Sequence, residues 1–107
     1  MILLKQGVRM GNLCPQIVLA LTICDGIYVA HDAGGMWVTS LNDGIHGERS
    51  FHYSGRACDL RTHSIREAAK PEILAAIRGA LGSDFQVFHE SKGTPNEHFH
   101  IEYQPMI

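Results

Sequence analysis

The sequence lacks the features that mark several common protein classes. Its three cysteines are an odd number with no C-x-x-C pair, so neither a disulfide framework nor a cysteine zinc site is expected. The thiols are expected to be reduced and mostly buried. The nine lysines and arginines form no basic run and the formal net charge is −2, which argues against a nucleic-acid partner.

Long hydrophobic runs are also missing. The apolar stretch 17–23 follows Lys5 and Arg9, but it is far shorter than the ~20 apolar residues that cross a bilayer. No A-x-A cleavage site follows it. We therefore expect no membrane contact and cytoplasmic synthesis without an export signal. A chain of 107 residues predicts a single domain over 1–107, and we expect it to be a monomer.

The pattern of apolar residues predicts two helices and a small sheet. A helix is predicted over 12–25, ended by Gly26, and its apolar residues lie almost all round, as expected of a helix buried against a sheet. A capping box at Ser64 and Glu67 precedes a helical segment that ends at Gly82. Strands are predicted over 36–39, 55–61, 85–89 and 98–103. The fold class is therefore α+β, a small sheet covered by two helices.

The residues with metal-binding chemistry lie in two segments, 50–60 and 97–102. Catalytic zinc takes three protein ligands and keeps a fourth position for water, and imidazole and carboxylate are suitable ligands. His52 and Asp59 can converge if Gly55 lets the backbone turn sharply, and His100 on a neighbouring strand supplies a third ligand. Spacing alone favours ordinary surface or core histidines on a metal-free domain over a metal site.

The two segments also resemble a known family of zinc proteins. The stretch S-x-H-x-x-G-x-A-x-D-L at 50–60, followed by E-x-x-H at 97–100, is similar to the signature of D-Ala-D-Ala carboxypeptidases. Related phage L-alanyl-D-glutamate endopeptidases and the hedgehog signalling domain share it. The chain also resembles hedgehog in D-G-I-H at 43–46, in H-Y-x-G-R-A at 52–57 and in E-S-K at 90–92 before H-x-H. The resemblance covers about residues 36–104.

The resemblance implies a small antiparallel sheet with helices on one side and Zn²⁺ in an open groove. It implies that His52, Asp59 and His100 are the zinc ligands. The acidic residue three before the last ligand, Glu97, would be the general base that takes a proton from water and passes it to the leaving amine. Glu90, which matches the acidic residue of the hedgehog E-S-K, is the alternative base.

Further site residues follow from the same resemblance. His46 would donate a hydrogen bond to the tetrahedral oxyanion, although it is equally well a surface loop residue. His98 would line the groove or orient a ligand, and Ser50 would bind the substrate backbone or brace its loop.

Those peptidases also use an arginine that precedes the first ligand in the chain to hold or polarise substrate. Arg9 lies far upstream of His52, and it has no secure alignment with that position. Arg49, Arg56 and Arg61 are alternatives, of which Arg56 and Arg61 are expected to be surface strand residues.

The function implied is zinc-dependent hydrolysis of peptide bonds in the stem peptides of bacterial peptidoglycan. Carboxypeptidase and endopeptidase action both remain open. A compact chain without an export signal favours a phage lysis enzyme that a membrane-permeabilising partner releases to the cell wall, rather than a bacterial wall-remodelling enzyme. The alternative function is a hedgehog-like zinc-binding module with a structural or recognition role and no turnover.

Overall fold

A five-stranded sheet forms the body of the protein. The computed structural model describes residues 1–42, 51–52 and 54–105. The strands are β1 (Ile2–Leu4), β2 (Met36–Ser40), β3 (Ala57–Arg61), β4 (Phe85–Glu90) and β5 (His98–Tyr103). Their order in the sheet is β1-β2-β3-β5-β4, with β1 parallel to β2 and the other pairs antiparallel. The predicted α+β class is confirmed.

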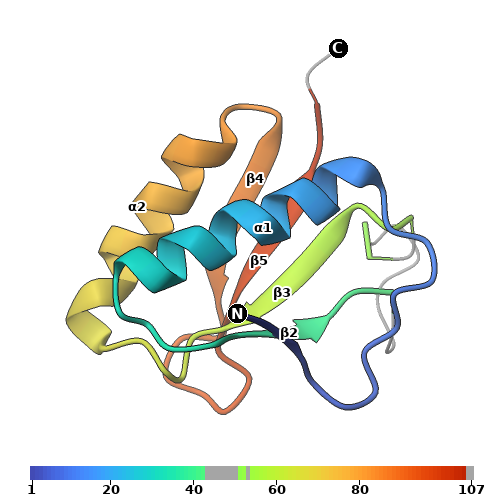
Figure 1. Ribbon diagram of the computed structural model, residues 1–107. Helices are drawn as coiled ribbons and strands as arrows, with labels where there is room; N and C mark the ends of the chain where they lie inside the picture. The colour runs from blue at the N-terminus through green and yellow to red at the C-terminus, as the bar shows by residue number, and fades with distance from the viewer. Residues whose placement is uncertain (43–50, 53, 106–107) are drawn as a thin grey trace.

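Two helices, α1 (Pro15–Ala30) and α2 (Lys70–Leu81), lie side by side on one face of this sheet, as Figure 1 shows. A short 3₁₀ turn, η1 (Glu67–Ala69), precedes α2. Within the described residues, neither helix is long and apolar enough to cross a bilayer. Among the described residues, no helix covers the other face of the sheet, and polar side chains lie there.

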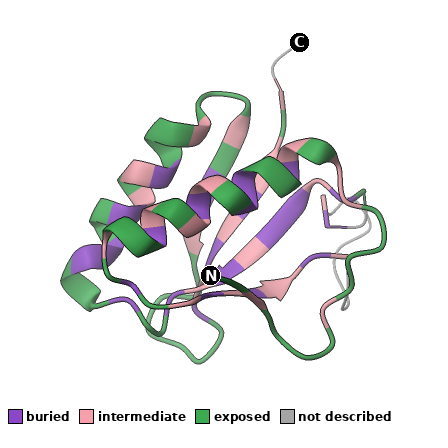
Figure 2. Cartoon of the chain, viewed as in Figure 1, coloured by how far each residue is buried: buried purple, intermediate pink, exposed green. Residues whose placement is uncertain are grey.

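Alternation along β5 separates the two faces. Phe99 and Ile101 are fully buried towards the helices, whereas His98, His100 and Glu102 point to the opposite face. The core between sheet and helices is made of aliphatic and aromatic side chains, and the largest of them that are fully buried include Tyr28, Phe99, Ile17, Met36, Leu41, Leu60, Ile73 and Ile77. Figure 2 shows the buried residues as stripes on the inner side of each helix.

Helix α1 differs from its prediction at both its end and its exposed face. Gly26 does not end the helix, which continues to Ala30. The last turn buries Tyr28, whose hydroxyl donates to the carbonyl oxygen of Arg61 at 2.8 Å, and this packing outweighs the ~1 kcal/mol cost of an internal glycine. The helix buries one stripe, while Val18 and Leu19 are exposed on the outer face.

The start of the second helical segment also differs. No side-chain cap forms at its N-terminus, so the Ser64–Glu67 capping box is absent. Glu67 instead accepts a hydrogen bond from Lys70 at 2.5 Å. Gly82 ends α2 with φ 78°, as predicted. Strand β1 was not predicted, because three residues are too few for a period-2 pattern to stand out.

Candidate metal centre

A sharp turn delivers His52 to the open face of the sheet. Gly55 closes the turn with φ 72°, and its N–H donates to the carbonyl oxygen of His52 at 3.1 Å. The backbone carbonyl of Asn12 packs so close that an added Cβ at Gly55 would lie 1.4 Å from its oxygen. Only glycine fits both the dihedral angle and the space, so the predicted need for a glycine here is met.

Asp59 and His100 stand opposite each other on neighbouring strands. They are register partners in the β3–β5 ladder, and Phe88 of β4 extends the same cross-strand row. Nδ1 of His100 lies 2.8 Å from Oδ1 of Asp59, and Nε2 of His52 lies 3.4 Å from the same oxygen. The ligand atoms of His52, Asp59 and His100 all lie within 4.8 Å of one another, so these three groups can hold one metal ion.

The second nitrogen of each imidazole is also held. Nδ1–H of His52 donates to the carbonyl oxygen of Leu41 at 2.7 Å, which leaves Nε2 facing Asp59. Nε2 of His100 lies 2.8 Å from Oε1 of Glu102. Metal-ligating histidines almost always donate their other N–H to a carbonyl or carboxylate in this way. The donor set therefore fits a divalent ion such as Zn²⁺.

Burial and charge strengthen the cluster. His52 is 3% exposed, and the side chains of Asp59 and His100 are 13% and 12% exposed. Burial by itself would raise the pKa of Asp59, but hydrogen bonds from His100 and His52 hold that pKa far below its usual value. Burial would lower the pKa of His100, yet Asp59 and Glu102 raise it to about 9. The carboxylate is thus ionised, and His100 must release a ring proton when the cluster binds a cation.

The next cross-strand row carries Glu90, His98 and Arg61, in that order from β4 to β3. Nδ1–H of His98 donates to the carbonyl oxygen of Asn96 at 2.6 Å, and its Nε2 lies 3.0 Å from Oε1 of Glu90 and 3.8 Å from Oδ1 of Asp59. His98 therefore connects Glu90 to the cluster. The side chain of Glu90 is 47% exposed and can meet a solvent molecule.

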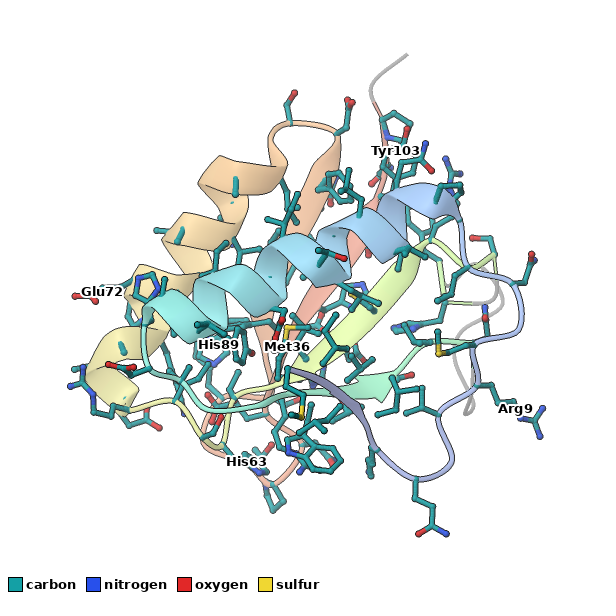
Figure 3. The ribbon with its side chains drawn as sticks, in the orientation of Figure 1. Arg9, Met36, His63, Glu72, His89 and Tyr103 are labelled. Carbon is teal, nitrogen blue, oxygen red and sulfur yellow. The ribbon has the colours of Figure 1, made fainter. Side chains whose placement is uncertain are left out.

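Glu97 does not reach the cluster. It borders the groove beside the site, but its carboxylate is buried: Nζ of Lys70 lies 2.9 Å from Oε2 and 3.1 Å from Oε1, and Nε2 of His89 lies 2.5 Å from Oε2. Lys70 belongs to α2, and His89, labelled in Figure 3, packs edge-on against the core residue Phe99. The carboxylate is thus on the helix side of the sheet.

The ionisation of Glu97 also argues against the role first predicted for it. Burial by itself would raise its pKa, but Lys70 and His89 lower that pKa to about 2. A carboxylate with so low a pKa accepts a proton poorly. Glu90 is therefore the more accessible of the two carboxylates, and the choice of general base stays a prediction.

Two other expectations concern residues outside the described part of the chain. His46 and Ser50 both fall in the stretch 43–50, so their predicted contacts to oxyanion and substrate stay predictions. The expectation for the cysteines is confirmed: all three are free, and Cys24 and Cys58 are buried. Burial raises the pKa of Cys24 to about 12, and this thiol packs in the hydrophobic core.

Sequence reasoning missed two neighbours of His100. Phe88, 40% exposed, stacks on its ring with the centroids 6.3 Å apart, and Glu102 holds its Nε2. The alternation His98, His100, Glu102 placed Glu102 on the site face, so its position was readable from the sequence. The position of Phe88 depends on the β4–β5 register, which no short motif encodes.

Comparison with known proteins gives a partial likeness. No protein-family model matches the chain. A stretch of 51 residues, 48% of the chain, is 47% identical to Indian hedgehog B protein of Danio rerio. The matched stretch spans only 12% of that protein's length. Together with the His52–Asp59–His100 cluster, this likeness is compatible with a hedgehog-like metal-binding domain.

Proposed function

We propose that this protein is a zinc-dependent peptidase that cleaves stem peptides of bacterial peptidoglycan. The observation that carries the proposal is the three-donor cluster of His52, Asp59 and His100 on the open sheet face. Three protein ligands are typical of catalytic zinc, whereas structural zinc is usually closed by four. The substrate class rests on the resemblance of 50–60 and 97–100 to the D-Ala-D-Ala carboxypeptidase signature.

Glu90 is the general base in this proposal. The chemistry that zinc supplies in such a site is Lewis acidity towards a carbonyl oxygen and towards water. Glu90 takes the proton of the attacking water and returns it to the leaving amine. His98 holds Oε1 of Glu90 from one side, and Asp59 faces the same imidazole, so the base is oriented towards the cluster. Phe88 shields one side of His100 from solvent.

A hedgehog-like zinc module without turnover is the second candidate. The 47% identity of a 51-residue stretch to Indian hedgehog B protein favours it. The half-exposed Glu90 beside the cluster favours the peptidase, because a purely structural site has no need of an accessible carboxylate.

One experiment separates the two candidates. Purified protein is assayed for zinc by elemental analysis and incubated with purified peptidoglycan, and released fragments are identified by mass spectrometry. We expect about one zinc per chain and release of peptides, with Glu90→Gln keeping the zinc and losing release. Glu72→Gln, an exposed glutamate on α2, is the matched control. Full zinc content without any release supports the module instead.

A further inference from the structure

Of the three candidate ligands, His52 is the one that no strand carries. Asp59 and His100 are paired in the β3–β5 ladder, so the sheet fixes their side chains relative to each other. His52 instead lies in the turn that precedes β3. A ligand on a loop is placed less precisely than one on a strand, so the position of His52 depends on the contacts that hold this turn.

The backbone of Arg56 joins the turn to the sheet. Its N–H donates to the carbonyl oxygen of Phe51 at 2.8 Å, which brings the two ends of the turn together. Its carbonyl oxygen accepts a hydrogen bond from the N–H of Tyr103 at 2.8 Å, at the end of β5. Arg56 thus belongs both to the turn that carries His52 and to the sheet that carries the other two ligands.

The side chain of Arg56 makes a second link of the same kind. It was expected to be a surface strand residue, but it directly precedes β3 and is half-buried. Its guanidinium carbon lies 5.8 Å from the centre of the Phe51 ring and 5.5 Å from that of the Tyr103 ring, in two cation–π contacts. Tyr103, labelled in Figure 3, packs in turn against Phe85 of β4 with the ring centres 5.2 Å apart. The neighbour of His52 in the chain is thus fastened to two strands.

Neither the charge partners of Arg56 nor its place suggests a contact with substrate. Among the described residues, no carboxylate forms an ion pair with it, and it does not line the groove beside the cluster. It lies three residues before Asp59, which at roughly 3.3 Å per residue is about 10 Å along the chain. A positive charge at that distance disfavours a bound cation only weakly.

We propose that Arg56 is a positioning residue of the metal centre. Its contact with Phe51 holds the turn in place, so that His52 faces the two strand ligands before a metal ion binds. Without this contact the ion must order the turn as it binds, and its affinity falls accordingly. The inference rests on the metal centre of the proposed function and not on hydrolysis.

Zinc affinity, measured in competition with a chromophoric chelator, tests this role. We expect Arg56→Gln to weaken zinc binding roughly tenfold, the lower end of the usual effect of contacts that support metal ligands, because Asn42 and Gly55 still hold the turn. Arg61→Gln is the matched control, since Arg61 makes the same kind of contact with Trp37, at 5.4 Å, but lies on the strand. Loss of a positive charge by itself favours a bound cation, so the control should not weaken zinc binding.

A double-mutant cycle assigns the effect to the contact itself. Phe51→Leu removes the ring and keeps an apolar side chain, so it should weaken zinc binding on its own but add little to Arg56→Gln. At saturating Co²⁺, the visible absorption spectrum of each variant should equal that of the wild-type protein, because the three ligands are unchanged. An unchanged zinc affinity in Arg56→Gln, even with a lower melting temperature, overturns the proposal, and so do additive losses in the cycle.

A second variant keeps the test decisive if Arg56→Gln does not fold. Arg56→Lys keeps the charge and loses the planar stacking group, so it should bind zinc less tightly than the wild-type protein. Equal zinc affinity in this variant overturns the role of the guanidinium. If the wild-type protein binds no zinc, the metal centre and the proposal both fall. Zinc binding without hydrolysis of peptidoglycan rejects the peptidase and leaves the positioning role standing.

Discussion

The two glutamates at the ends of the β4–β5 connection have opposite surroundings. Glu90 ends β4, is half-exposed and contacts one imidazole on the open face. Glu97 precedes β5, is 7% exposed and is bonded to Lys70 and His89 on the helix side. Spacing to the last histidine favoured Glu97, yet the structure gives the accessible position to Glu90. The role of a carboxylate thus depends on the face of the sheet that it occupies.

The largest difference expected between them is in catalysis. Glu90→Gln removes the proton acceptor and should lower peptidoglycan hydrolysis about 10²- to 10⁴-fold with zinc retained. Glu97→Gln should keep activity within a few-fold at a temperature where the variant is folded. Initial rates of peptide release measure both. The opposite ranking would assign the base to Glu97 and break the comparison.

The next difference is in stability. Glu97→Gln leaves the buried ammonium of Lys70 without its buried counter-ion, so the free energy of unfolding should fall by about 2 kcal/mol. The melting temperature should fall by roughly 10 °C. Glu67→Gln is the matched control, because Glu67 contacts the same ammonium but is 87% exposed and should contribute under ~1 kcal/mol. Equal losses of unfolding free energy in the two variants would contradict the larger contribution expected of the buried ion pair.

Low pH should destabilise the fold by protonating Glu97. The pKa of Glu97 in the folded protein is about 2, below its ordinary 4.5, so its ionised form stabilises the fold above about pH 5. That contribution is lost as the pH falls from 4.5 through 2. Thermal unfolding of metal-free protein across this range should show a smaller acid-induced drop in Glu97→Gln. A slope unchanged by the substitution would show that other carboxylates, Asp59 foremost, dominate.

The smallest expected change in stability concerns the buried hydroxyl group of Thr62. Thr62 is fully buried, and its hydroxyl has no hydrogen-bond partner among the described residues. Thr62→Val keeps the shape and removes the unpaired hydroxyl, so stability should rise by about 1 kcal/mol. Chemical denaturation measures the change. A loss of stability would indicate that the hydroxyl has an unseen partner.

The sequence predicted the parts of this molecule whose pattern is local. The alternation from His98 to Tyr103 marked β5 residue by residue, and Gly82 marked the end of α2. The metal cluster was predictable because its residues lie in two recognisable segments. The prediction that Gly26 ends α1 was wrong, because the helix continues in order to bury Tyr28, and that burial depends on tertiary packing. The environment of Glu97 depends on Lys70, which lies in a distant helix, and no spacing rule contains that contact.

The close packing of Gly55 against the carbonyl of Asn12 links the N-terminal segment to the metal centre. In the same turn, the carbonyl oxygen of Gly55 accepts a hydrogen bond from the N–H of Cys14 at 2.9 Å, directly before α1. An ion that fixes His52 therefore also restrains residues 12–14. Limited proteolysis should cut the chain at residues 12–14 more slowly after zinc is added, and chelation should restore the rate of cleavage. Loss of residues 12–14 would accordingly weaken metal retention without removing a ligand.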